Sequence, residues 1–265
     1  MGYIFDFQDA RSYADWWSQQ SDQWAAALEL ELMTKLLNPC PGETILDIGC
    51  GIGMSSRHLL NLGLNVTGID PSPYMLDMAL ANLGNRVDLY RGFAEELPFD
   101  DNSFNHALFF LSLEFVNDPS QAIAEAFRVA KDRVFLGFFN RYALKAIQRL
   151  LMGFSTYTAF QHARYYSIWE VKKLTRSLLG SVPVTWRTVC HLPGAPTKVL
   201  RNLEQSYIVQ QSPFGAFAGL SVTVVPKFRT RPLAMRYKPK TSARIIPGSA
   251  PVGSTATGRN QSRRL

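Results

Sequence analysis

The sequence predicts an α/β fold with a doubly wound, mostly parallel sheet of seven strands. Three observations carry this prediction. Short apolar runs alternate with segments of helical periodicity from residue 43 onward, which is typical of parallel β-α-β units. A glycine-rich loop follows the first apolar run in ETILDIGCGIG (43–53). The second apolar run ends in an acid, Asp70, which stands 23 residues after Asp47.

Each element has a local signal. Apolar side chains recur at helical spacing within 8–37. This spacing predicts two helices, the second of which ends at Asn38, before Pro39. Strands are expected at 43–49, 65–70, 87–91, 106–113, 133–138, 183–189 and 216–225. Later helices are expected at 54–62, 71–84, 119–129, 141–154 and 168–179. Ser167 and Glu170 have the spacing of a capping box for the last helix. Strands that alternate with helices in this way form right-handed crossovers.

The glycine-rich loop has the pattern of a ligand-binding turn. Gly49, Gly51 and Gly53 stand at alternate positions, and glycine there leaves bare main chain for a ligand to approach. A dinucleotide fingerprint, G-x-G-x-x-G, would place its third glycine at position 54. That residue is Met54, and Asp47 stands two residues before the first glycine. We therefore expect the loop to bind S-adenosylmethionine rather than NAD.

Asp70 supports this expectation. Dinucleotide-type α/β units place an acid about 20 residues beyond the glycine loop, at the end of the second strand, where it accepts hydrogen bonds from ribose hydroxyls. Ligands of open α/β sheets bind beyond the carboxyl ends of the strands. Asp47, Asp70, the segment 93–95 and Leu111 all fall at or near such ends, so one cofactor can contact all of them.

Four segments give a specific resemblance. They are LDIGCGIG, GIDPSPYML, AEELPFDDNSF and EFVNDPSQAIAEAFRVAKDRVFLGFFNR. Together they resemble the class I S-adenosylmethionine-dependent methyltransferases, in the branch of the ubiquinone and menaquinone C-methyltransferases and many small-molecule methyltransferases. The resemblance runs from about residue 8 to residue 180 and is weaker to residue 226. It implies a Rossmann-like sheet whose final strand is antiparallel and lies at the edge.

The resemblance also implies a cofactor site. Its expected residues are Asp47, Gly49, Gly51, Gly53, Asp70, Pro71, Met75, Phe93, Ala94, Glu95 and Leu111. The three glycines would line the methionyl part, and Asp47 would hold the loop and, through the backbone or a water, the cofactor amino group. Asp70 would bind the ribose hydroxyls, with Pro71 and Met75 beside the adenine.

The chain departs from the family pattern at three places. Phe93 stands where an aspartate often accepts from the adenine amino group, so we expect stacking by Phe93 and backbone contacts at Ala94 instead. Asn105 replaces an aspartate. Ala130, Lys131 and Asp132 replace a Pro-Gly-Gly turn. The last two departures are expected to lie away from the cofactor.

The group that accepts the methyl is less defined by the sequence. A carbon or nitrogen nucleophile may need no base, whereas an oxygen nucleophile usually does. His162 and Glu114 are candidate bases, and Tyr13 and Tyr166 are candidate positioning groups. Aromatic residues are dense in 8–37 and 141–166, which are expected to cap the pocket. An aromatic pocket indicates a small apolar or aromatic substrate.

Charge is concentrated at one end of the chain. Residues 227–265 hold ten Lys and Arg and no Asp or Glu, so residues 1–226 carry a net charge of −3 against +7 for all 265 residues. This composition predicts a methyltransferase domain over 1–226 and a disordered basic tail over 227–265, which could make transient anionic contacts. A slightly acidic body argues against an obligate nucleic-acid partner.

Apolar runs, cysteines and histidines give expectations about the cellular location of the protein and about bound metals. The longest apolar run is far below the about 20 residues that span a membrane, and no amino-terminal secretory signal is expected. Cys40, Cys50 and Cys190 form no C-x-x-C pair, and the histidines show no metal-ligand spacing, so we expect neither a disulfide nor a metal. A cytoplasmic protein in a reducing environment is the resulting expectation.

Three functions remain open from the sequence. The leading prediction is methyl transfer to a small molecule. The second is RNA or protein methylation in which the basic tail binds the substrate. The third is a non-catalytic scaffold that binds the cofactor, which Phe93 favours and the intact glycine loop and Asp70 disfavour.

Overall fold

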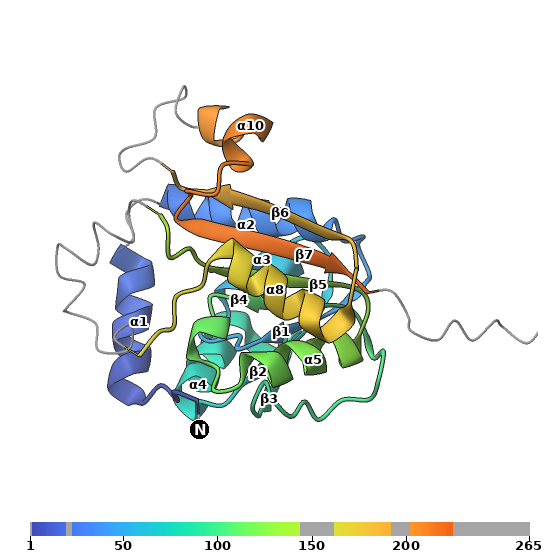
Figure 1. Ribbon diagram of the computed structural model, residues 1–265. Helices are drawn as coiled ribbons and strands as arrows, with labels where there is room; N and C mark the ends of the chain where they lie inside the picture. The colour runs from blue at the N-terminus through green and yellow to red at the C-terminus, as the bar shows by residue number, and fades with distance from the viewer. Residues whose placement is uncertain (1, 20–22, 144–161, 192–201, 225–265) are drawn as a thin grey trace, which may run out of the picture. The chain divides into compact units, whose positions relative to one another are not determined.

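The computed structural model describes residues 2–19, 23–143, 162–191 and 202–224. Its centre is a seven-stranded sheet in the order β3-β2-β1-β4-β5-β7-β6 (Figure 1). The strands are β1 (Thr44–Ile48), β2 (Asn65–Asp70), β3 (Asp88–Arg91), β4 (Phe104–Phe110), β5 (Ala130–Phe139), β6 (Val184–Val189) and β7 (Phe217–Thr223). Strands β1 to β5 pair in parallel. The predicted fold class and all seven strands are thus confirmed.

The position of the last strand differs from the expectation. β7 runs antiparallel, as expected, but it pairs with β5 on one side and β6 on the other, so β6 is the edge strand. The burial of the two strands explains this order. Six of the seven residues of β7 are buried, whereas most of β6 is only half-buried or exposed. A strand that is apolar on both faces is most stable inside a sheet.

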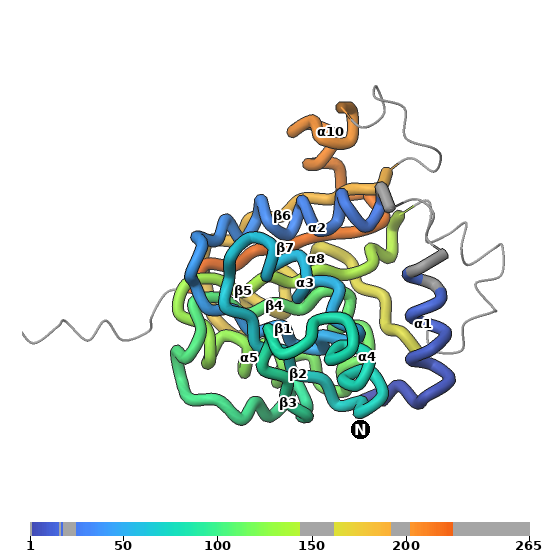
Figure 2. Tube along the Cα trace, turned by 180° about the vertical axis from the view of Figure 1, so that it is seen from behind, coloured from blue at the N-terminus to red at the C-terminus, as the bar shows by residue number. Residues whose placement is uncertain are grey.

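Helices cover both faces of the sheet. The main helices are α1 (Phe7–Gln19), α2 (Gln23–Leu37), α3 (Met54–Asn61), α4 (Pro73–Leu83), α5 (Pro119–Val129), α8 (Ile168–Leu179) and α10 (Tyr207–Gln210). Figure 1 shows α5 and α8 in front of the sheet, and Figure 2 shows α2, α3 and α4 on the opposite face. Each face has its own buried apolar cluster. Because both faces are covered, the central strands β1 and β4 are buried along most of their length.

The helix starts follow the signals in the sequence. Ser72 caps α4 by accepting from the backbone of Met75, so α4 begins at Pro73, two residues after the expected start. Asp118 caps α5. The capping box of Ser167 and Glu170 at α8 is formed. The helix expected at 141–154 falls almost wholly outside the described residues, as do 155–161 and the tail at 227–265.

The connections place a binding site at one edge of the sheet. From β1 the chain continues to β2 and β3 on one side, and then returns to β4 and β5 on the other. The strand order therefore reverses between β1 and β4. The carboxyl ends of these two strands flank a crevice, which is the place where open α/β sheets bind ligands.

Candidate cofactor site

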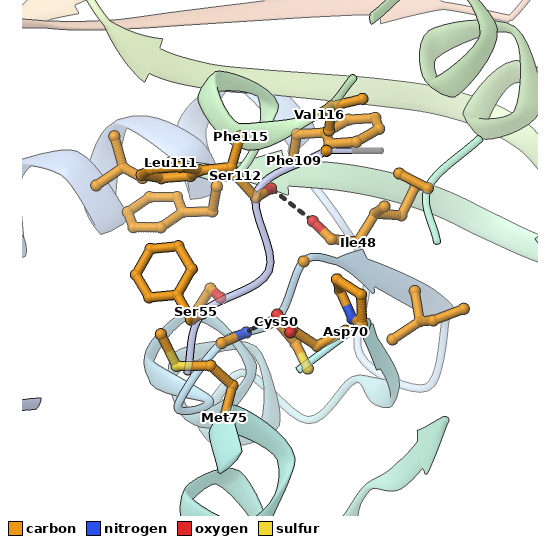
Figure 3. Close-up of a pocket in the computed structure, with 18 of the residues that line it drawn as sticks. Ile48, Cys50, Ser55, Asp70, Met75, Phe109, Leu111, Ser112, Phe115 and Val116 are labelled. Carbon is orange, nitrogen blue, oxygen red and sulfur yellow. Dashed lines mark hydrogen bonds between the residues drawn. The ribbon is translucent and has the colours of Figure 1, made fainter. Parts of the chain in front are cut away.

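A cleft lies at the carboxyl ends of β1, β2 and β4 and contains about 890 Å³ of empty space, its mouth included. Predicted residues that line it are Gly49, Gly51, Asp70, Pro71, Met75, Phe93, Ala94, Glu95, Leu111 and Tyr13. Figure 3 shows Cys50, Ser55, Asp70 and Met75 on one side of the cleft and Phe109, Leu111, Ser112, Phe115 and Val116 on the other.

The glycine loop needs its glycines for two different reasons. All three have positive φ: +71° at Gly49, +52° at Gly51 and +83° at Gly53. A Cβ on Gly49 would lie 2.4 Å from Cβ of Ser112, and one on Gly53 would lie 2.6 Å from Leu83. A Cβ on Gly51 would meet nothing within 4 Å. Gly49 and Gly53 are therefore required by packing, whereas Gly51 leaves open space in the cleft.

Asp70 fixes the loop from the end of β2. Its Oδ2 accepts the backbone N–H of Gly51 at 3.0 Å, and its Oδ1 accepts the N–H of Ser72 at 2.9 Å. The side chain is only 7% exposed, and this burial raises the pKa of Asp70 to about 6. A carboxylate has about four lone-pair sites, so Asp70 keeps acceptor capacity for hydroxyl groups of a ligand.

Asp47 acts behind the loop rather than in the cleft. It is fully buried and does not line the cleft. Its Oδ2 accepts the hydroxyls of Ser55 and Ser56, each at 2.6 Å, which anchors the first turn of α3. Burial raises the pKa of Asp47, and the two hydroxyls oppose that rise. The structure places Asp47 as a support of the loop, and shows no direct route from its carboxylate to a ligand.

The opposite wall is made by the turn after β4. Leu111 has φ +56°, a left-handed conformation that costs a non-glycine residue about 1–2 kcal/mol. Its N–H is held by the carbonyl of Gly137 at 2.9 Å. Ser112 donates from Oγ to the carbonyl of Ile48 at 2.6 Å (Figure 3). Strained backbone conformations of this kind are frequent at functional sites. Leu111 has such a conformation and lines the cleft.

The segment after β3 forms a third side. Phe93 is 39% exposed and lines the cleft with Ala94, a position from which its ring can stack on a flat ligand. Glu95 also lines the cleft, but Oε1 accepts the N–H groups of Asn117 and Asp118 at 3.0 and 3.2 Å. Its carboxylate therefore also fastens the start of α5.

The amino-terminal segment is a part of the site that the sequence analysis missed. Gly2, Tyr3 and Phe5 line the cleft. The segment is held by the N–H of Tyr3, which donates to the carbonyl of Phe115 at 3.0 Å, and by the hydroxyl of Ser72, which donates to the carbonyl of Phe5 at 2.6 Å. Extended backbone without periodicity gives no signal in a sequence. The early aromatic residues Tyr3 and Phe5 were the only available hint.

The candidate bases lie outside the lining of the cleft. His162 is exposed and stacks on Tyr3, with ring centroids 4.3 Å apart. Glu114 is 2% exposed and is not among the residues that line the cleft, and its Oε1 accepts the N–H of Phe139 at 2.8 Å. Within the described part of the chain, Oε2 of Glu114 has no hydrogen-bond partner. Burial raises the pKa of Glu114 to about 7.

The two candidate tyrosines differ in place. Tyr13 lines the cleft, and burial together with the nearby carboxylates of Glu114, Glu29 and Asp70 raises its pKa, so its phenol remains protonated. Tyr166 is 2% exposed and belongs to the apolar cluster beside Phe138. The structure therefore places Tyr13 at the site and Tyr166 in the core.

Comparison with known proteins finds methyltransferases that match part of the chain. Residues 46–138 match the family model described as "Methyltransferase domain". An uncharacterized methyltransferase of Mycobacterium tuberculosis is 41% identical over 95 residues, which are 36% of this chain and 38% of the relative. A demethylmenaquinone methyltransferase of Renibacterium salmoninarum is 36% identical over 100 residues, or 38% of this chain and 42% of the relative. The matches thus span less than half of these relatives.

A solved structure shows the same fold over most of the chain. It is a SAM-dependent methyltransferase of Thermotoga maritima, named as a possible histamine N-methyltransferase. The two share a TM-score of 0.61 at 22% identity, over 83% of this chain and 99% of the other. Separately, among the described residues, no helix combines the length and apolar character needed to cross a membrane.

Proposed function

We propose that this chain is a class I S-adenosylmethionine-dependent methyltransferase and that it transfers a methyl group to a small apolar or aromatic molecule. The cleft beside Asp70 and Gly51 is the observation that carries the proposal. It combines a buried carboxylate that accepts hydrogen bonds with a stretch of bare backbone over open space. Both features suit a ligand that has ribose hydroxyls and a flexible amino-acid end.

The lining residues fit the cofactor. Asp70 is the acceptor for the two ribose hydroxyls, a charge-assisted contact that ligands without these hydroxyls cannot make. Met75, on the same side of the cleft as Asp70, and Phe93, on the third side, offer apolar surfaces for the adenine. The loop from Gly49 to Gly51 would contact the methionyl end, because a side chain at Gly51 would occupy that space. The bound cofactor supplies an electrophilic methyl group on a positively charged sulfur.

The protein contributes alignment and exclusion of water. The segment of Tyr3 and Phe5 covers the cleft and is fixed by hydrogen bonds at both residues. Phe115 packs against Phe5 with the rings 4.9 Å apart, and Tyr13 adds an aromatic ring nearby. An enclosed apolar wall excludes water and holds the acceptor near the methyl group. These aromatic residues support an apolar or aromatic acceptor.

The comparisons with known proteins also support a small acceptor. The family match covers the cofactor half of the chain, and a demethylmenaquinone methyltransferase among the relatives is in keeping with a small acceptor.

A methyl-transfer screen tests this function. The full chain is incubated with S-adenosylmethionine carrying a radiolabelled methyl group and with cell extract that is then split into small-molecule and macromolecular fractions. We expect label in the small-molecule fraction. Label only in RNA or protein would replace the proposal with macromolecular methylation. Tight cofactor binding without any label would favour a scaffold.

A further inference from the structure

A second cluster of polar side chains lies at the opposite edge of the sheet, away from the cleft. Glu43 directly precedes β1, His106 is on β4 and Asp132 is on β5. The strands β1, β4 and β5 are parallel neighbours, so their amino ends meet at one edge. One ligand atom from each of the three side chains lies within 4.8 Å of the other two. These three residues are far apart in the sequence, so their spacing does not indicate a metal site, and the sequence analysis expected no metal.

The side chains are held in place by their surroundings. Oε2 of Glu43 contacts Nε2 of His106 at 2.9 Å and accepts the backbone N–H of Cys40 at 2.7 Å. Asn105 donates from Nδ2 to Oδ2 of Asp132 at 2.9 Å, while its Oδ1 accepts the hydroxyl of Thr44 at 3.0 Å. Asn105 therefore positions Asp132 relative to β1.

A backbone irregularity also directs Asp132 toward this cluster. Phe104 pairs with Ala130, but His106 pairs with Arg133. One residue of β4, Asn105, is thus opposite two residues of β5, Lys131 and Asp132, and this extra residue makes a β-bulge. Bulges turn side chains in a new direction and are frequent beside sites.

The charges of the cluster favour a cation. Two carboxylates at this separation repel each other, and one imidazolium would compensate only one of them. The side chain of His106 is 4% exposed, and its Nδ1 has no hydrogen-bond partner in the described part of the chain. The guanidinium of Arg133 also lies near Glu43; it keeps its charge and donates to the carbonyl of Leu37.

We propose that Glu43, His106 and Asp132 bind one divalent transition-metal ion of the zinc type. One imidazole nitrogen and two carboxylate oxygens are ligands that such an ion accepts, with water in the remaining position. Metal–ligand bonds of about 2.0–2.2 Å require Asp132, which is exposed, to move slightly closer. The ion links the amino ends of three strands and stabilises the fold, and it takes no part in the chemistry of the cleft.

Calorimetric titration with Zn²⁺ tests the site on the untagged full chain after treatment with a chelator. We expect one ion per chain, and a rise in melting temperature with the ion. Asp132→Asn should weaken binding at least tenfold and lose the thermal effect. Asp88→Asn is the matched control, because Asp88 is an exposed carboxylate at the start of β3, and it should bind like the wild type. His106→Gln should also lose binding.

Cobalt absorption separates this site from the cysteines. Co²⁺ at Glu43, His106 and Asp132 should give no thiolate charge-transfer band, whereas binding at Cys40, Cys50 or Cys190 would give one. Three outcomes overturn the proposal: no saturable Zn²⁺ binding, unchanged binding by Asp132→Asn, or a thiolate band. In each case the cluster is only an ion pair between Glu43 and His106 beside the hydrogen bond from Asn105 to Asp132.

Discussion

The carboxylate of Asp70 accepts the backbone N–H of Gly51 across 3.0 Å, so the end of β2 fixes the middle of the glycine loop. The acid therefore has two roles that depend on the same charge. It orders the loop, and it offers its remaining lone pairs to the ligand. Any change that protonates or replaces Asp70 should therefore weaken both the order of the loop and the binding of the ligand.

The first prediction concerns pH. Burial raises the pKa of Asp70 to about 6, so the group loses its charge as the pH falls through about 6 rather than through 4. Cofactor affinity should be constant above pH 7 and about tenfold lower at pH 5. Calorimetry with S-adenosylhomocysteine across this range measures the effect. Asp70→Asn should bind weakly at every pH, and an equal pH dependence in that variant would exclude Asp70 as the titrating group.

The second prediction separates the ligand role of Gly51 from backbone strain. Gly51→Val should abolish cofactor binding while the domain remains folded, because the new side chain enters open space in the cleft. Gly42→Val is the control: Gly42 has φ +88° and equal open space, but it precedes β1. Both variants should lose about 1–2 kcal/mol of stability. If Gly51→Val binds the cofactor like Gly42→Val, the loop does not cradle the ligand.

The third prediction concerns the stability cost of Glu114. Burial raises its pKa to about 7, against 4.5 for an exposed glutamate. The folded state therefore binds the proton more tightly than the unfolded chain, so the stability that Glu114 contributes is present at low pH and is lost as the pH rises through about 7. Relative to the wild type, Glu114→Gln should gain up to about 3 kcal/mol between pH 5 and pH 8. Urea unfolding at both pH values measures this, and a constant difference would show that Glu114 does not titrate there.

The fourth prediction contrasts two tyrosines. Tyr13→Ala should lower turnover much more than stability, because Tyr13 lines the cleft. Tyr166→Ala should instead lower stability by about 3–5 kcal/mol, as aromatic truncations in a core do, because Tyr166 is 2% exposed among Phe138 and other apolar residues. Thermal unfolding and kcat are measured for both. Loss of turnover by Tyr166→Ala in a fully stable protein would return that residue to the site.

The sequence predicted the parts of the fold that depend on local signals. The seven strands, the capping box at Ser167 and the positions of Gly51 and Asp70 at strand ends all follow from short-range patterns. The site could be located because parallel strands bring their carboxyl ends together. The structure places Pro71, Met75, Phe93 and Ala94 at the same cleft.

Features that depend on tertiary contacts were not predictable in this way. The inner position of β7 follows from burial on both faces, which only the folded sheet decides. Asp47 and Glu114 do not line the cleft. Their carboxylates accept hydrogen bonds from Ser55, Ser56 and the backbone of Phe139 instead. The cluster of Glu43, His106 and Asp132 comes from distant parts of the chain. No spacing rule joins such residues.

Competitive calorimetry with S-adenosylhomocysteine, S-adenosylmethionine and NAD tests the central claim most directly. The full chain should bind S-adenosylhomocysteine at one site, S-adenosylmethionine should compete for it, and Gly51→Val should bind neither. NAD should not compete, because Met54 replaces the third glycine of the dinucleotide fingerprint. Equal or tighter binding of NAD, or no binding of the methylated and demethylated cofactor by the wild type, would contradict the account.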